Sequence, residues 1–165
     1  MPGVAINGSE IYESVKSGHV TYSIEHYEKV GEHCAERDTD TGSCIDWDDD
    51  YDWVSAGSGS TGARITGFIS LSNSKIKISG VGVATVGDRT IERWEASPSI
   101  PSSDSSYRYT ATSPTSGTGQ GTITLGSTKG KLGGKSIALI GSTVTTCLGT
   151  TTTIKTGNEK MKFGS

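Results

Sequence analysis

Two segments of this chain repeat each other, and the repeat limits the possible folds more than any other sequence feature. Residues 67–88 (GFISLSNSKIKISGVGVATVGD) and 121–142 (GTITLGSTKGKLGGKSIALIGS) align without a gap. The identical pairs are Gly67/Gly121, Ile69/Ile123, Leu71/Leu125, Lys75/Lys129, Lys77/Lys131, Gly80/Gly134, Ala84/Ala138 and Gly87/Gly141. Because self-similarity at a fixed offset is typical of repeated structural units, the sequence predicts two copies of one motif.

A third copy is divided between the two ends of the chain. Residues 154–163 (IKTGNEKMKF) match the first half of the motif, and residues 3–9 (GVAINGS) match its second half. Three equivalent units around an axis close into a ring if the first and last half-units pair. We therefore expect the two termini to lie side by side, which also covers sheet edges that a strand-rich protein must protect.

Each unit has the pattern of a β-hairpin. In the first copy, an alternating strand at Ile69 and Leu71 precedes a turn at residues 72–74 and a lysine-apolar strand at 75–78. The chain turns again at Gly80, and in the second copy the first turn falls at 126–128. Apolar residues make up only 32% of the chain and glycine is abundant, which favours short strands and tight turns. The predicted fold class is all-β, with three hairpin repeats closed by the termini.

One domain over residues 1–165 accounts for this length. Its repeat segments are 1–9 with 149–165, 67–90 and 121–147, and its insertions are 10–66 and 91–120. Within the insertions we expect a strand at 19–24, a short helix at 24–35, a flexible turn at 55–61, and a loop-like second insertion with a short strand at 107–109. The aromatic residues of the first insertion either pack over the body as a second core or contact neighbouring proteins.

Charge and composition argue against several functional classes. The net charge is −3 and no basic stripe is present, so no nucleic-acid partner is expected. The acidic residues at 46–52 are interpreted as a solvated loop. Neither a signal peptide nor an apolar stretch long enough to span a bilayer is found, so we expect synthesis in the cytoplasm. His19, Asp38 and Ser43 are the residue types of a catalytic triad, but no Gly-x-Ser-x-Gly elbow accompanies them, and no enzyme is predicted.

The repeated segments resemble the PAAR repeat family. The resemblance is carried by residues 80–90 (GVGVATVGDRT), by 136–147 (SIALIGSTVTTC), which ends in a cysteine as the family's last repeat does, and by the start MPGVA. It covers residues 1–9, 67–90 and 121–165, about half of the chain. The proline and arginine of the family's name-giving tetrapeptide are absent, and its aspartate is kept only at Asp88. Ser9 and Ser142 occupy that position in the other units.

The resemblance implies a structural role in an injection machine. PAAR proteins are small conical β-prisms that cap the blunt end of a trimeric β-helical spike, one cap per trimer, in phage tails, type VI secretion systems and related particles. It implies a membrane-piercing spike tip, most consistent with a phage tail baseplate, that is assembled into the virion tail or injection particle. Other baseplate proteins and, transiently, the target membrane are the further partners it implies.

The family also implies a structural metal ion near the vertex, held by histidine and cysteine. In this chain the candidate ligands are His19, His26, His33 and Cys147, which together form a closed tetrahedral set suited to zinc, with iron as the alternative. Cys34 beside His33 is a possible replacement ligand. The opposing interpretation is a polar surface loop with Cys147 as a small buried apolar residue. Cys34 and Cys44 pair with each other or belong to another metal site.

A carbohydrate-binding β-prism or adhesin-like module is the alternative function. Trp47, Tyr51 and Trp53 suit stacking against sugars, and the neighbouring aspartates suit calcium. The sequence alone leaves this alternative open beside the spike tip.

Overall fold

Every regular element is a β-strand in residues 2–72 and 76–162, the ranges that the computed structural model describes. The strands are β1 (Gly3–Val4), β2 (Ser14–Arg37), β3 (Cys44–Ser70), β4 (Lys77–Ile78), β5 (Val81–Gly82), β6 (Arg89–Ser97), β7 (Tyr107–Ala111), β8 (Ser116–Ile123), β9 (Lys131–Leu132), β10 (Lys135–Ser136), β11 (Thr143–Thr145), β12 (Thr151–Thr153) and β13 (Asn158–Lys162). The predicted all-β class is confirmed. Within these ranges no helix is long and apolar enough to cross a membrane.

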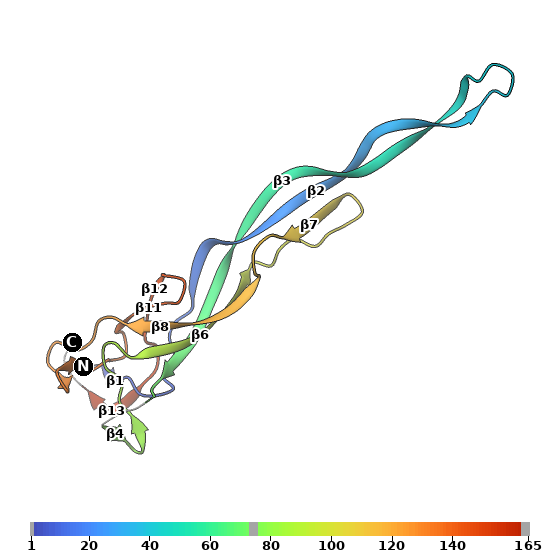
Figure 1. The fold of residues 1–165 in the computed structure, drawn as a ribbon. Coiled ribbons are helices and arrows are strands. Elements are labelled where there is room, and N and C mark those ends of the chain that lie inside the picture. Colours follow the sequence, from blue (N-terminus) through green and yellow to red (C-terminus); the bar gives the residue numbers. More distant parts are fainter. Residues whose placement is uncertain (1, 73–75, 163–165) are drawn as a thin grey trace.

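The main sheet has seven antiparallel strands in the order β12-β11-β8-β6-β3-β2-β7. It curls into a half-barrel at one end, beside β1 and β13, and continues at the other end as a long twisted ribbon (Figure 1). The curled part and the small hairpins beside it are called the body below. The ribbon is the paired length of β2 and β3.

The ribbon forms because two long segments pair as antiparallel strands from Ser14↔Ile65 to Arg37↔Cys44. Several register shifts, such as the one between Ser23 and Glu25, interrupt the ladder, and such bulges increase the twist of a β-ribbon. β6 supports β3 only from Gly62 onward, and β7 supports β2 only over residues 22–26. Beyond these points the described ribbon consists of two strands alone.

Four expectations for the insertions are corrected by the structure. The acidic residues at 46–52, interpreted as a loop, are mostly exposed to solvent but belong to β3. The helix expected at 24–35 is wrong, because these residues belong to β2, and the turn expected at 55–61 is wrong, because they belong to β3. The weak helical spacing is outweighed by a long-range partner strand that satisfies the backbone groups. The loop-like second insertion is also largely strand, since β6 and β8 occupy both its ends, whereas the strands expected at 19–24 and 107–109 are confirmed.

Two-stranded hairpins lie at the end of the body opposite the ribbon tip (Figure 1). β4 pairs with β5 and β9 pairs with β10, each through a two-residue turn. The turns need left-handed backbone, with φ of 52° and 80° at Ser79 and Gly80 and of 60° and 83° at Gly133 and Gly134. Of the turn expected at 72–74, residues 73 and 74 lie outside the described residues.

The two ends of the chain pair with each other, as expected from the divided third copy. Gly3 of β1 lies opposite Lys162 of β13, and Val4 lies opposite Asn158, with a register shift between the two pairs. A side chain at Gly3 would meet the Asn158 carbonyl oxygen at 2.7 Å, so glycine permits this close approach.

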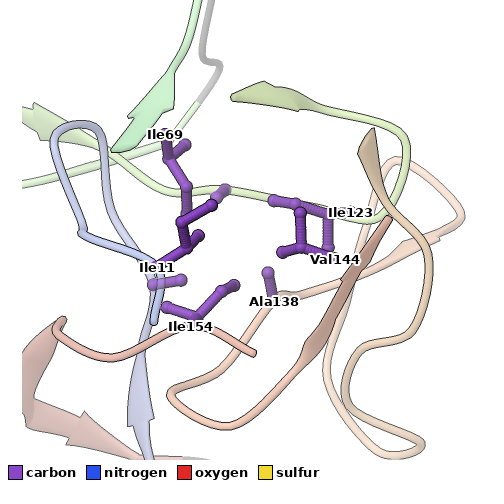
Figure 2. Close-up of a cluster of buried hydrophobic side chains, with 8 residues drawn as sticks. Ile11, Ile69, Ile123, Ala138, Val144 and Ile154 are labelled. Atoms are coloured by element: carbon purple, nitrogen blue, oxygen red, sulfur yellow. The ribbon is translucent and has the colours of Figure 1, made fainter. Parts of the chain in front are cut away.

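The largest apolar cluster lies where the body segments converge (Figure 2). Its buried members are Ala5, Ile11, Ile69, Ala84, Ile123, Ala138, Val144 and Ile154. A second cluster, Val4, Val83, Ile137 and Leu139, is covered by Ile78 and Leu132 from the hairpins. A third cluster, Val20, Ala63, Ile65 and Trp94, lies at the base of the ribbon. The apolar core is therefore confined to the body and the ribbon's base.

The bare end of the ribbon is closed by a disulfide between Cys34 and Cys44. Replacing both cysteines by serine is expected to ease local opening of the ribbon tip by about 2–3 kcal/mol, because the short covalent loop is lost. Hydrogen exchange at residues 28–36 and 45–53 should become faster, while Ala84 in the body should exchange as before. Cys147→Ser, which leaves the disulfide intact, is the control, and unchanged exchange in the ribbon of the double variant would contradict the expectation.

Candidate functional site

Three short segments of the body are joined by a closed cycle of backbone hydrogen bonds. The N–H of Ala5 donates to the carbonyl oxygen of Ala138 (2.9 Å), that of Ala138 to Ala84 (2.9 Å), and that of Ala84 to Ala5 (3.0 Å). All three alanines have 0% exposed surface. Each segment therefore donates one hydrogen bond and accepts one. The small methyl side chains allow the three backbones to meet at one place.

The same hydrogen bonds follow the alanine in each of the three segments. Each segment closes a tight turn with a backbone bond, from Ser9 to Ile6 (2.9 Å), from Asp88 to Thr85 (3.1 Å) and from Ser142 to Leu139 (2.9 Å). A glycine at positive φ precedes the donor in every case, namely Gly8, Gly87 and Gly141. The recurrent glycines of the sequence are thus explained by left-handed turn positions, which other residues adopt at a cost.

One side-chain hydrogen bond also recurs and explains why aspartate and serine alternate at this position. Ser9 Oγ accepts from the Ile6 N–H at 2.9 Å. Asp88 Oδ2 accepts from Thr85 N–H and Ser142 Oγ accepts from Leu139 N–H, both at 2.8 Å. Aspartate and serine both supply an oxygen that accepts from a nearby backbone N–H. The loss of aspartate from two segments therefore leaves the turn intact.

Each turn glycine connects its segment to a buried isoleucine from a later part of the chain. The N–H groups of the three turn glycines donate to carbonyl oxygens at 2.8 to 2.9 Å, in the pairs Gly8/Ile69, Gly87/Ile123 and Gly141/Ile154. All three isoleucines are fully buried, and their side chains meet in the centre of the body (Figure 2). The hydrogen-bonded cycle and the largest apolar cluster are thus one packed unit.

The four residues suggested as zinc ligands are not brought together. His19, His26 and His33 all lie on β2, seven residues apart. At a rise of about 3.3 Å per residue, each step along a strand covers roughly 23 Å. One ion with bonds of about 2 Å cannot contact all three imidazoles in this conformation. No group of three or more histidine, cysteine, aspartate or glutamate side chains able to hold a metal occurs among the described residues.

Each histidine instead has its own neighbours. The ring of His19 contacts the edge of Trp94, with centroids 4.7 Å apart. His26 lies beside Tyr107, with centroids 4.8 Å apart, and its Nδ1 is 3.1 Å from Glu28. His33 Nδ1 is 2.6 Å from Asp50 near the ribbon tip. The three rings thus serve three local contacts along the ribbon.

Cys147 lies in the body and belongs to a buried polar network. The carboxylate of Glu92, which is 1% exposed, accepts from Thr90 Oγ1 (2.5 Å) and from the Cys147 N–H (2.6 Å). Gly119 allows the close approach of Cys147, because a side chain there would meet the cysteine Cβ at 2.5 Å. Burial, and then a hydrogen bond to Glu92, raise the pKa of the Cys147 thiol to about 11. Sequence reasoning identified Cys147 but missed Glu92. Glu92 is buried between exposed neighbours in β6, a position that the alternating strand pattern could have flagged as part of the core.

The aromatic residues of the first insertion line the ribbon. Tyr27 stacks on Tyr51 with centroids 5.6 Å apart and lies 5.2 Å from Trp53. The guanidinium of Arg108 sits 4.7 Å above the Trp53 ring and also pairs with Glu25 at 2.8 Å. These contacts stiffen the ribbon near the start of β7, where Tyr107 pairs with His26. They do not form the second core over the body that was one of the two expectations.

If the three turns are equivalent, their acceptors should be interchangeable. Ser142→Asp, which reproduces the group found at Asp88, is expected to retain the stability of the protein. Ser142→Ala removes the acceptor for the Leu139 N–H and should cost about 1 kcal/mol of unfolding free energy. Denaturant unfolding of both variants measures the difference, and an aspartate variant as unstable as the alanine variant would contradict the equivalence.

The environment of Cys147 predicts its chemistry. With the disulfide intact, the rate of thiol alkylation by iodoacetamide should rise with a midpoint near pH 11, rather than near the ordinary value of 9.0. Because the unfolded chain releases this proton first, the stability due to the neutral thiol is present below pH 9.0 and lost as the pH rises through about 11. Cys147→Ser should lack this loss. A midpoint at or below pH 9.0 would contradict the network.

Comparison with known proteins finds no similar protein. No family model matches the chain, and no curated protein and no solved structure matches it either. The function therefore rests on the residues and contacts of this chain alone.

Proposed function

We propose that this chain is a PAAR-type spike tip, a small conical β-prism of three hairpin repeats that caps a trimeric β-helical spike in a contractile injection machine. A phage tail baseplate is the machine that suits it best. The role is mechanical, and assembly into the particle brings the tip to the target membrane.

The closed cycle of hydrogen bonds among Ala5, Ala84 and Ala138 carries this proposal. It supports a pseudo-threefold axis through the body, since each segment has the same donor, the same acceptor and the same following turn. A single chain with such an axis fits a partner with true threefold symmetry, because each of its three units can meet an identical chain. The pairing of β1 with β13 supports the closure of the third unit from the two chain ends.

The two ends of the molecule suit different tasks. The hairpins and the second apolar cluster lie at one end, and the ribbon projects from the other (Figure 1). We assign docking to the hairpin end, where short strands cover the buried second cluster and give it a fixed shape. The ribbon then points away from the spike, and its disulfide and aromatic stack resist fraying at the leading end. The disulfide closes the ribbon covalently at this leading end, whereas the described residues do not assemble the predicted metal site in this conformation.

The stoichiometry of the complex tests the proposal. Mixed with the trimeric β-helical spike protein of its own particle, the chain is expected to form a complex of one cap per three spike chains, measured by light scattering after gel filtration. Ala84→Leu, which overfills the hydrogen-bonded cycle, should weaken the complex, whereas Ala111→Leu on the exposed face of β7 should not. Absence of a complex, or three caps per trimer, would refute the capping role.

A carbohydrate-binding or adhesin-like role is the second candidate, favoured by the exposed aromatic residues of the ribbon. Trp47 is 57% exposed and Tyr51 is 51% exposed. Sugar rings stack on such faces. Binding on a glycan array that is lost in Trp47→Ala, together with no spike complex, would favour this second function over the first.

A further inference from the structure

Three lysines occupy corresponding places in three two-stranded pairs of the body, namely the two hairpins and the paired chain ends. Lys77 of β4 lies opposite Gly82, and Lys131 of β9 lies opposite Ser136. Lys162 of β13 lies opposite Gly3. The partners Gly3, Gly82 and Ser136 are themselves aligned in the repeat, so the register places each lysine at the same point of its unit. All three lysines are exposed.

Two of the three lysines, Lys77 and Lys131, alternate with a residue that faces the body. Ile78 follows Lys77 and Leu132 follows Lys131, and both apolar side chains pack against the second apolar cluster. Since neighbouring strand residues point to opposite faces, Lys77 and Lys131 stand on the outer face of their hairpins. The nearest exposed partner of Lys162 is Glu159, 3.7 Å away, a distance and exposure at which a pair contributes little.

Charge is strongly segregated along the molecule. Residues 10–66, which build the ribbon, contain thirteen acidic and four basic residues. The repeat segments 67–88 and 121–165 contain eight lysines and only two acidic residues. The chain is therefore acidic overall, yet its docking end is basic, and the total charge conceals this difference.

We propose that Lys77, Lys131 and Lys162 form a basic rim that binds an acidic end of a threefold-symmetric protein. Each lysine would meet one of the three partner chains. This proposal rests on the capping function. Charged residues are typical of the rim of a protein interface, where they stay partly exposed to solvent. Complementary charge steers the encounter and fixes which surfaces meet. The acidic ribbon repels the same partner, so only the hairpin end docks.

The acidic end of a threefold-symmetric protein fits these observations better than a nucleic acid or a membrane does. Nucleic acids and anionic bilayers are bound by continuous basic stripes or clusters, whereas the lysines of this end are divided among three separate two-stranded pairs. The acidic ribbon also opposes adsorption to either polyanion. One carboxylate group from each of three identical chains satisfies the arrangement.

The experiment uses two probes, so that the rim and the capping function are tested separately. The first probe is the trimeric spike protein, and the second is a three-stranded coiled coil whose chains each end in a short glutamate segment. Affinity is measured at about 50 mM and 500 mM salt for the full chain and for the triple variant Lys77→Gln/Lys131→Gln/Lys162→Gln. The control triple variant, Lys16→Gln/Arg37→Gln/Arg93→Gln, removes as many charges from exposed residues outside the hairpins.

We expect the rim variant to bind both probes about tenfold more weakly at low salt, with a smaller difference at high salt, because rim pairs are screened. The control variant should bind as the unchanged protein does. Circular dichroism and thermal unfolding of each variant confirm that the body remains folded.

The outcomes separate the two proposals. If the chain binds the spike one to three and the rim variant binds within twofold of it, the rim is refuted while the capping function stands. If the spike is not bound but the glutamate coiled coil is bound through the rim, the capping function fails and the acidic threefold preference stands. Stronger lysine-dependent binding to duplex DNA or to vesicles of anionic phosphatidylserine than to either trimer would overturn the assignment of a protein partner.

Discussion

The body of this protein depends on three alanines whose backbones bond to one another in a cycle. Ala5, Ala84 and Ala138 come from the beginning, the middle and the last third of the chain, so the cycle fixes distant segments at one place. Only a small side chain leaves room for three backbones, and the buried isoleucines around them supply the apolar area that the alanines cannot. A tight turn follows each of these alanines, and the two chain ends pair beside Ala5.

The sequence correctly predicted the all-β class and the pairing of the two chain ends. Identities such as Ala84/Ala138 and Gly87/Gly141 are required by shared backbone geometry, so they survive where exposed residues diverge, and the divided third copy correctly predicted that the chain ends pair. The ribbon was missed because its stability comes from pairing between residues 14–37 and 44–70, which local spacing does not record. A weak helical pattern at 24–35 was therefore misinterpreted as a helix.

The candidate site shows the same division. Three histidines at regular spacing suggested convergence, but regular spacing on one extended strand separates side chains instead of gathering them. Cys147 was singled out as a ligand, whereas its described partner is the buried carboxylate of Glu92, fifty-five residues away in the chain. Charge segregation between ribbon and hairpins was present in the sequence throughout, but it acquires meaning only when the hairpins are known to share one end of the body.

The central claim is that one chain forms a closed body from three equivalent segments, and an NMR experiment on the 17.2 kDa protein tests it most directly. Scalar couplings across hydrogen bonds connect an amide nitrogen to the carbonyl carbon of its acceptor. We predict three such couplings, from Ala5 to Ala138, from Ala138 to Ala84 and from Ala84 to Ala5. Couplings that join these amides to other carbonyls, or to none, would contradict the closed body and the capping function built on it.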